Sequence, residues 1–372
     1  MSTEHDVIII GAGPAGLAAA AALRHKGIEP FVLDDKQRVG DSWRAHYSSL
    51  FLNSVKRLSA LPFQPMPAHY PRYPSRDQVV DYLTAYAAQQ DIVPCSGQRV
   101  EHVRFADGVW QVKTAAEVRI AKQVVVATGM TRMPAVIDAP GLESFPGVYM
   151  HSREFKTGAD YAGQRALIVG GGNSAVDIAM DLLSHRAKVH LAIRSPMHFT
   201  PLDLLGMPAQ VTSILLSFLP LAVADAFAKT VLRLWFGDLR KYGIQTPAEG
   251  PIRTLVSKGR PPTFDRGIVR EIKCGRVGIR PGLQKIAGKT VTFSNGDKSD
   301  YDVIVFAIGY TTGLFALLPD NQNLLTAGGK PKQTARNTGN GLYFIGFNES
   351  QRGLLNEIGH EATRIASVVA SG

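Results

Sequence analysis

The sequence predicts an α/β protein with two doubly wound parallel sheets, the second inserted into the chain of the first. The first observation is the run VIII at 7–10, which is typical of a strand buried on both faces of a parallel sheet and leads directly into the glycine turn GAGPAG. The second is a repeat of this pattern around Gly170, in ALIVGGGNSAVDIAMDLL. With 372 residues, the chain has room for two or three domains of ~150 residues each.

The elements of the first sheet can be followed along the chain. Residues 17–23 read as an alanine-rich helix whose small side chains allow close packing, and FVLDD from Phe31 is the next strand. A helix with one apolar face is expected over 76–90. Residues 110–129 are expected to form a small antiparallel excursion that rejoins the first sheet through 124–127.

The tail of the chain is also expected to return to the first sheet. DVIVFAIGY (302–310) and GLYFIG (341–346) are apolar runs of the length of buried strands, and an amphipathic helix follows them. We therefore expect a first domain over 1–150, an inserted domain with a helical insertion over 151–288, and a return to the first domain over 289–372.

Composition excludes several classes of protein. The net charge is +10, from 41 Lys and Arg against 31 Asp and Glu, yet there is no long basic run and no nucleic-acid motif, so we expect no nucleic-acid partner. Cys95 and Cys274 are too few for a zinc site or a CxxC pair, and the histidines lack the spacing of metal ligands. The N-terminus, MSTEHDVIII, is too polar for a signal peptide, so a cytoplasmic protein is expected.

The longest apolar stretch of the sequence spans 211–236. Pro220 and Asp225 interrupt it, whereas a spanning helix needs ~20 uninterrupted apolar residues, so stable membrane insertion is not expected. Three roles fit the pattern: an ordinary pair of core-packing helices, a lid over a bound ligand, or an amphipathic patch that docks on a membrane.

The first glycine turn has the features of a dinucleotide site. Gly11 permits the tight turn, Gly13 lets the backbone approach a pyrophosphate, and Gly16 allows the helix to pack closely on the strand. The helix N-terminus offers free N–H groups to phosphates. Asp34 follows at the end of the next strand, where a carboxylate accepts the ribose hydroxyls, so the turn predicts a Rossmann-like dinucleotide-binding domain.

The second turn, GGGNSA, predicts another Rossmann-like domain with a different preference. Ala175 takes the third small position, and the strand after the helix ends in Arg194 rather than in an acid. An arginine there pairs with the 2′-phosphate of NADP, so NADPH is expected rather than NADH, unless Arg194 is merely a surface residue. One acid-type site and one phosphate-type site are what a flavin enzyme reduced by a nicotinamide requires, so we expect FAD in the first domain and NADPH in the second.

FPGVYMHSREF, at 145–155, resembles the FxGxxxHxxx(F/Y) fingerprint of the flavin-containing monooxygenases, which lies between the two nucleotide motifs in that family. Gly40 and Trp43 match the family's GGxW element, with Asp41 in place of the second glycine, and ATGMTRMP matches its ATGxxxxP turn. FAIGY resembles FATGY, with Ile308 instead of threonine. The segment 236–283 is most similar to the YUCCA-like branch, the indole-3-pyruvate monooxygenases and their bacterial relatives.

The resemblance and the two turns together imply the site residues. Asn53 falls where N-oxygenating members of the family place an asparagine that touches the flavin ring, so it is the candidate catalytic residue. His151 of the fingerprint is expected to act as a hydrogen-bonded linker histidine rather than as an acid or base. The expected cofactor-binding residues are Gly11, Gly13, Pro14, Ala15, Gly16, Asp34, Asp35, Gly40, Trp43, Arg44, Val100, Ala127, Thr128, Gly129, Gly170, Gly172, Asn173, Ser174, Ala175, Arg194, Ser195, Ala307, Gly309, Tyr310, Gly353 and Leu354.

The function that the resemblance implies is that of an FAD-dependent, NADPH-consuming monooxygenase. C4a-(hydro)peroxyflavin would form from O₂ and pass one oxygen atom to a small organic substrate, at nitrogen, at sulfur or at the carbonyl of a keto acid. Two alternatives remain from the residues alone: an NADPH oxidase or flavin reductase that passes electrons to O₂ or a partner, and a flavin redox sensor without turnover. The expected partners are therefore a small-molecule substrate and O₂.

Overall fold

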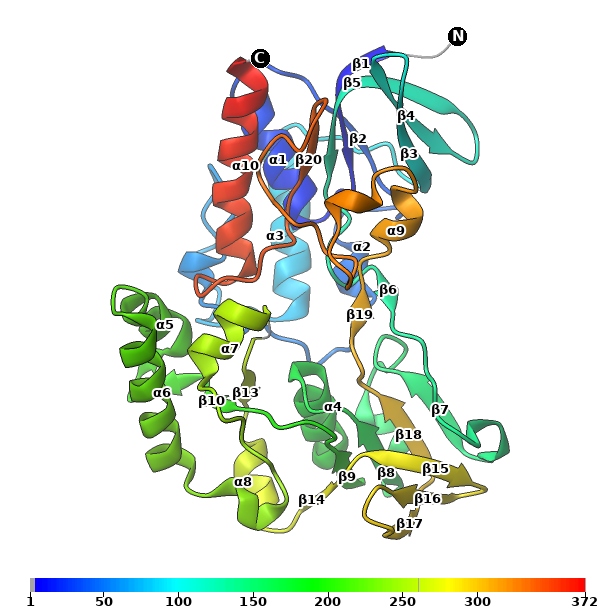
Figure 1. Ribbon diagram of the computed structural model, residues 1–372, viewed down its shortest axis with the longest axis vertical. Helices are drawn as coiled ribbons and strands as arrows, with labels where there is room; N and C mark the ends of the chain where they lie inside the picture. The colour runs from blue at the N-terminus through cyan, green and yellow to red at the C-terminus, as the bar shows by residue number, and fades with distance from the viewer. Residues whose placement is uncertain (1–3, 260, 372) are drawn as a thin grey trace. The chain divides into compact units, whose positions relative to one another are not determined.

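The computed structural model describes residues 4–259 and 261–371, which form two compact units (Figure 1). Unit 1 consists of Met1–Ala45, Ser54–Met133 and Tyr310–Gly372. Unit 2 consists of His46–Asn53 and Pro134–Gly309. The chain therefore enters unit 2 twice, first for a short segment and then for a complete α/β layer structure.

Unit 1 is built on a sheet with the strand order β2-β1-β5-β4-β3, with β20 paired to β5. The strands β1, β2, β5 and β20 run parallel, whereas β3 and β4 form the antiparallel excursion. Its strands are β1 (Glu4–Ile10), β2 (Phe31–Leu33), β3 (Val100–Ala106), β4 (Val109–Thr114), β5 (Val118–Val126), β19 (Tyr310–Thr311) and β20 (Leu342–Phe344). Its helices are α1 (Pro14–Arg24), α2 (Asp41–Arg44), α3 (Arg76–Gln89), α9 (Leu314–Leu317) and α10 (Leu354–Ser371), with 3-10 turns η1 (Lys56–Leu58) and η5 (Gln322–Leu324).

The helices α1, α3 and α10 of unit 1 form where the sequence pattern predicts them. The alanine run of α1 is buried, and Gly16 lies so close to the turn that a Cβ there would stand 1.7 Å from the Gly11 carbonyl oxygen. A capping box between Ser75 and Gln78 starts α3. Figure 1 shows α10 beside α1, against which it packs. The expected returns of 124–127 and of 341–346 to the first sheet are confirmed by the pairing of β5 and β20.

Unit 2 has a parallel sheet with the order β14-β9-β8-β18-β7. Its strands are β7 (Val148–His151), β8 (Arg165–Val169), β9 (Lys188–Ala192), β10 (Phe199–Pro201), β11 (Asp203–Leu204), β12 (Met207–Pro208), β13 (Thr263–Asp265), β14 (Val277–Arg280), β15 (Leu283–Ala287), β16 (Thr290–Phe293), β17 (Lys298–Asp300) and β18 (Val303–Phe306), while β6 (Met133–Pro134) lies where the chain passes from unit 1 to unit 2. Its helices are α4 (Asn173–Ser184), α5 (Ala209–Leu216), α6 (Leu221–Phe236), α7 (Pro251–Lys258) and α8 (Ile268–Lys273), with 3-10 turns η2 (Leu142–Ser144), η3 (Gly158–Tyr161) and η4 (Leu239–Tyr242).

One expected strand lies in the other sheet. The run 302–310 was expected to rejoin the first sheet, but β18 pairs with β8 and β7 of unit 2, with Val303 opposite both Ala166 and Val148. Four consecutive buried residues suit any central parallel strand, so the run by itself does not tell which sheet it joins. The compact unit consequently extends over 134–309 rather than ending at the expected boundary of 288.

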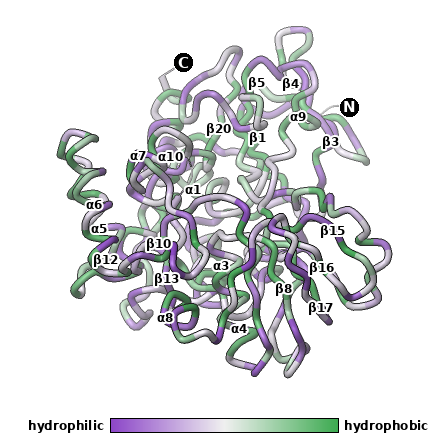
Figure 2. The backbone as a smooth tube through the Cα atoms, turned by 60° about the horizontal axis from the view of Figure 1, so that its bottom comes forward, coloured by the Kyte–Doolittle hydropathy of each residue, from purple (hydrophilic) through white to green (hydrophobic). Residues whose placement is uncertain are grey.

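The apolar stretch 211–236 forms the helices α5 and α6, which Figure 2 colours largely as hydrophobic. Ala224 and Phe236 are buried, but Phe218 and Leu234 expose 82% and 81% of their surface. The pair is therefore more than a core-packing element, because a row of large apolar side chains faces outward. Within the described ranges, no helix is both long and apolar enough to cross a membrane.

Candidate functional site

The turn between β1 and α1 leaves room for an anion at the helix N-terminus. Gly11 has φ +107°, and a Cβ there would meet the Ala127 carbonyl oxygen at 2.6 Å, so protein contacts alone require this glycine. Gly13 has an ordinary φ of −74° and no neighbouring atom within 4 Å of the Cβ position. Among the residues that the structure describes, no side chain caps α1. Uncapped N–H groups beside open space fit the pyrophosphate of a dinucleotide.

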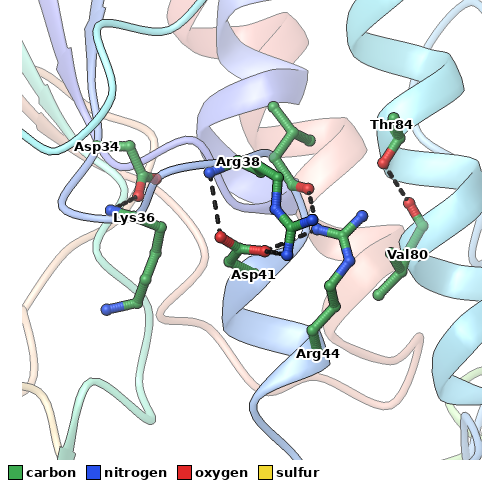
Figure 3. Close-up of polar contacts among 8 residues, drawn as sticks. Asp34, Lys36, Arg38, Asp41, Arg44, Val80 and Thr84 are labelled. Carbon is green, nitrogen blue, oxygen red and sulfur yellow. Dashed lines mark hydrogen bonds and ion pairs between the residues drawn. The ribbon is translucent and has the colours of Figure 1, made fainter.

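Asp34 lies at the same end of the sheet as this turn, because the Gly11 amide donates to the Leu33 carbonyl at 2.7 Å. The Asp34 carboxylate accepts a hydrogen bond of 2.7 Å from the Lys36 amide (Figure 3). It also accepts one from the Ala12 amide. Burial raises the pKa of Asp34, although the two amide bonds act against this shift. Each carboxylate oxygen keeps a second lone pair, so the group can also accept a ribose hydroxyl.

The GDSW element starts the short helix α2. Asp41, which replaces the second glycine of the family's GGxW element, has a structural function there. The Asp41 carboxylate accepts from the Arg44 guanidinium at 2.8 Å and from the Arg38 amide at 3.1 Å (Figure 3). Burial acts to raise the pKa of Asp41, but the bonds from Arg44 and Arg38 outweigh it and hold the pKa below its ordinary value. Gly40 begins the helix with φ +84°. Asp41 therefore orients Arg44, which also donates to the Val39 carbonyl.

The ATG turn, Ala127–Gly129, follows β5 and lies beside the first glycine turn. The Ala127 amide donates to the Ile10 carbonyl at 2.9 Å, and the next residue, Thr128, has a buried hydroxyl oxygen with no hydrogen-bond partner in the structure. An orphaned buried hydroxyl beside the glycine turn is the kind of group that a bound ligand satisfies. Val100 is buried at the start of β3. The first turn, Asp34 and Ala127–Gly129 thus come together as expected.

The expected amphipathic helix at the C-terminus is α10. Leu354 is its first residue, and Gly353 precedes it with φ +83°. A Cβ on Gly346 would stand 2.8 Å from the Ala15 side chain, so the loop before α10 lies against the first turn of α1. Within unit 1, the segment leading to α10 is therefore close to the N-terminus of α1.

The turn between β8 and α4 of unit 2 repeats the geometry of the first. Gly170 has φ +143°, and a Cβ there would meet the Ala307 carbonyl oxygen at 2.3 Å. Gly172 has φ −84°, open space at its Cβ position and no capping side chain, while Ala175 is fully buried. The Ala307 carbonyl of FAIGY therefore packs on Gly170 of the second turn in the same way that the Ala127 carbonyl of ATG packs on Gly11 of the first turn. His151, as expected, is a hydrogen-bonded histidine: its Nε2 lies 2.9 Å from the Gly309 carbonyl oxygen.

Just after β9 in unit 2, the side chain of Arg194 carries a positive charge that no described residue pairs with. Arg194 and Ser195 are exposed just after β9, and in the part of the chain that the structure describes the Arg194 guanidinium has neither a hydrogen bond nor an ion pair. Asn173 is occupied within the protein, because its side-chain oxygen accepts from the Phe264 amide at 2.8 Å. Of the polar side chains expected at this cofactor site, Arg194 is thus available to a ligand and Asn173 is a structural tether.

Asn53 lies in unit 2, on the short segment 46–53. Its side-chain oxygen accepts a hydrogen bond of 2.8 Å from the Arg266 guanidinium. Arg266 also pairs with Asp177 at 3.0 Å, and Asp177 accepts from the Tyr47 hydroxyl at 2.9 Å. The expected catalytic residue is therefore part of a connected polar cluster of unit 2.

Comparisons with known proteins agree with this geometry. The family model described as pyridine nucleotide-disulphide oxidoreductase matches residues 8–202. The chain is 37% identical over 356 residues to indole-3-pyruvate monooxygenase YUCCA1 of Oryza sativa subsp. japonica, covering 94% of this chain and 87% of that protein. It is 34% identical over 374 residues to the probable indole-3-pyruvate monooxygenase YUCCA1 of Arabidopsis thaliana, covering 98% and 89%. The chain belongs to the class B flavin-containing monooxygenase family, in its YUCCA-like branch.

The solved structures support the fold of this flavin monooxygenase. The flavin-containing monooxygenase from Stenotrophomonas maltophilia superposes with a TM-score of 0.73 at 22% identity, covering 99% of both chains. The 372-residue flavin monooxygenase itself depends on FAD and NADPH, and it transfers an oxygen atom to its substrate. The two open glycine turns fit that pair of cofactors, since each offers the N–H groups and the space that a pyrophosphate needs.

Three residues of the flavin monooxygenase were not singled out in the sequence: Tyr47, Asp177 and Arg266. Burial raises the pKa of Asp177 and, more strongly, that of Tyr47, which also lies beside the Asp177 charge. The available signal was a carboxylate in the apolar run AVDIAM of α4, because a buried charge requires a partner. The identity of that partner depends on long-range packing, which no local pattern reveals.

Proposed function

We propose that this flavin monooxygenase oxygenates an aryl-substituted 2-oxo acid, with indole-3-pyruvate as the model substrate. The observation that carries the proposal is the 37% identity to the rice indole-3-pyruvate monooxygenase over 94% of this chain. The likeness to the YUCCA branch within the segment 236–283 points the same way. Keto-acid oxygenation therefore has stronger support than oxygenation at nitrogen or sulfur.

The overall reaction is an oxidative decarboxylation. The 2-oxo acid, O₂, NADPH and one proton give the arylacetate that is one carbon shorter, CO₂, H₂O and NADP⁺. The bond between the keto carbon and the carboxylate carbon breaks, one oxygen atom of O₂ enters the new carboxylate, and the other leaves as water. NADPH supplies the two electrons, and FAD, when bound, supplies the redox chemistry that connects NADPH to O₂.

The residues of the chain bind and orient these components in the proposal. The N-terminus of α1 holds the FAD pyrophosphate and Asp34 the adenosine ribose, supported by the open position at Gly13. The N-terminus of α4 holds the NADPH pyrophosphate and Arg194 its 2′-phosphate, supported by the open position at Gly172. Asn53 presents a carboxamide to the reacting region. We place this chemistry in the cytoplasm, with the small-molecule acid and O₂ as partners.

A second candidate function is oxygenation of an amine or a sulfide. The observation that favours it is Asn53, which matches the asparagine of the N-oxygenating members of the family. Soft nitrogen and sulfur nucleophiles need no carbonyl-binding group, so this function would place fewer demands on the substrate side of the protein.

The test is a product assay of the purified holoenzyme with NADPH and isotopically labelled O₂. Parallel reactions contain indole-3-pyruvate, N,N-dimethylaniline or methyl phenyl sulfide. Because free H₂O₂ decarboxylates 2-oxo acids without an enzyme, each reaction is run with and without catalase. The proposal expects labelled indole-3-acetate, formed with catalase present and in step with NADPH consumption. Labelled N-oxide or sulfoxide with no indole-3-acetate would establish the second function, and H₂O₂ alone would reject both.

A further inference from the structure

The position of Asn53 is determined by contacts within unit 2. The segment 46–53 is joined to this unit by the Tyr47 hydroxyl on Asp177 and by the Ser48 amide on the Lys156 carbonyl at 3.0 Å. Tyr47 itself is 3% exposed and belongs to the main apolar core of unit 2. The segment that carries Asn53 is therefore anchored on α4, the helix of the second glycine turn.

Arg266 links this anchor to Asn53 through one planar group. Its Nε forms an ion pair with the Asp177 carboxylate at 3.0 Å, while its Nη2 donates to the Asn53 side-chain oxygen at 2.8 Å and to the Phe51 carbonyl at 3.1 Å. The guanidinium also lies 5.4 Å from the centre of the Phe51 ring. Because the guanidinium is planar and rigid, its ion pair with Asp177 through Nε also restricts where its Nη2 points.

This arrangement decides which way the Asn53 carboxamide faces. A guanidinium carries only donors, so the atom turned toward Arg266 must be the carboxamide oxygen, and the NH₂ group points elsewhere. Among the residues that the structure describes, that NH₂ group has no hydrogen-bond acceptor. Asn53 is thus held as a donor with an unused N–H pair.

We propose that Arg266 is a positioning residue that holds the Asn53 carboxamide in its donor orientation, with Asp177 fixing Arg266. The inference rests on the role of Asn53 in the proposed function and deepens it. Asp177 is suited to its part, since its side chain is 3% exposed and Arg266 is the cation paired with it among the described residues. Loss of Arg266 would free the amide to rotate, so the donor would be present only part of the time.

The test measures H₂O₂ release by the FAD-loaded enzyme with NADPH and O₂ but no organic substrate, so it does not depend on which substrate is correct. We expect Asn53→Leu to raise the rate of H₂O₂ release about tenfold, since a charge-polarised hydrogen bond near the reacting oxygen is lost. Arg266→Met should give a rise of similar size. The double variant should release H₂O₂ no faster than either single variant, because both remove the same donor.

Two further variants separate positioning from folding. Arg266→Lys keeps a cation for Asp177 but lacks the fork that reaches two acceptors, so it should recover most of the thermal stability lost in Arg266→Met while H₂O₂ release stays raised. Arg270→Met makes the same replacement at an exposed position on α8, and it should leave both quantities unchanged.

A readout without turnover is the side-chain amide signal of Asn53 in ¹⁵N-labelled holoenzyme, identified by its absence in Asn53→Leu. It should shift in Arg266→Met and stay in place in Arg270→Met. An unchanged signal in Arg266→Met, or additive effects of the two substitutions on H₂O₂ release, would overturn the positioning role. If Asn53→Leu does not raise H₂O₂ release, the role of Asn53 fails first. If it does and Arg266→Met does not, only the present inference fails.

Discussion

The Tyr47 hydroxyl donates a hydrogen bond of 2.9 Å to the Asp177 carboxylate, across 130 positions of the chain. Both residues are buried, with 3% and 4% of their surface exposed. A charge at this depth is tolerated only when polar partners satisfy it, and Asp177 has a hydrogen-bond donor in Tyr47 and an ion-pair partner in Arg266. The contact explains why a short piece of chain between two parts of unit 1 folds with unit 2.

Replacing Tyr47 with phenylalanine tests this contact. Tyr47→Phe keeps the ring and removes one donor from a buried carboxylate, so we expect the free energy of unfolding to fall by about 1–3 kcal/mol. Urea denaturation followed by circular dichroism measures the change. Tyr242→Phe, at a residue that is 38% exposed, is the matched control and should change stability by less than ~0.5 kcal/mol. Equal stability of both variants would show that the Tyr47 hydroxyl is not needed.

The open position at Gly13 predicts a separation of folding from cofactor binding. A Cβ there has no protein atom other than its chain neighbours within 4 Å, so Gly13→Val should leave the FAD-free protein folded but prevent FAD binding, because the new methyl groups occupy the pyrophosphate space. Flavin absorbance after purification and thermal unfolding of the FAD-free protein are the two measurements. In contrast, Gly16→Val drives a Cβ to 1.7 Å from the Gly11 carbonyl oxygen and should abolish folding. Full FAD content in Gly13→Val would remove this turn from the flavin site.

Arg194 should determine the preference for NADPH. Its exposed guanidinium has no protein partner in the described residues, so Arg194→Ala costs little in stability but removes a charge-assisted bond to the 2′-phosphate. We expect a loss of ~1.5–3 kcal/mol, roughly 10- to 150-fold in NADPH affinity, with little change for NADH. Titration with both nucleotides checks the difference. A parallel loss for NADH would mean that Arg194 does not contact the phosphate.

Asp302 should contribute to stability in a defined acid range. Its carboxylate accepts from the Arg165 amide at 3.0 Å and from Lys289 at 3.2 Å, and these bonds, the amide first, lower its pKa from 3.8 to about 2. A carboxyl group with a lowered folded-state pKa stabilises the protein above pH 3.8, and this contribution is lost as the pH falls toward about 2. Unfolding free energies measured across that range should therefore fall less in Asp302→Asn than in the unaltered protein. Parallel curves would contradict the assignment.

The local pattern of the sequence was sufficient for both glycine turns and the elements around them. At Gly11 and Gly170, the backbone has a positive φ and a carbonyl oxygen at the Cβ position, so only glycine fits, whatever the rest of the chain does. At Gly13 and Gly172 the protein itself imposes no such limit, and the glycine in the motif indicates the ligand instead. Such short-range requirements leave a direct trace in the sequence.

Tertiary structure alone decided the sheet to which the run 303–306 belongs and the unit to which Asn53 belongs. A strand of four buried residues suits either sheet, and the choice of β8 and β7 follows from register and packing far along the chain. Likewise, Asn53 reads as a residue of the first domain by position, but the bonds of Tyr47 and Arg266 to Asp177 hold its segment in unit 2. Tyr47 and Asp177 are 130 residues apart and Asp177 and Arg266 are 89 apart, so no local pattern encodes these contacts, and they become visible only when the chain is folded.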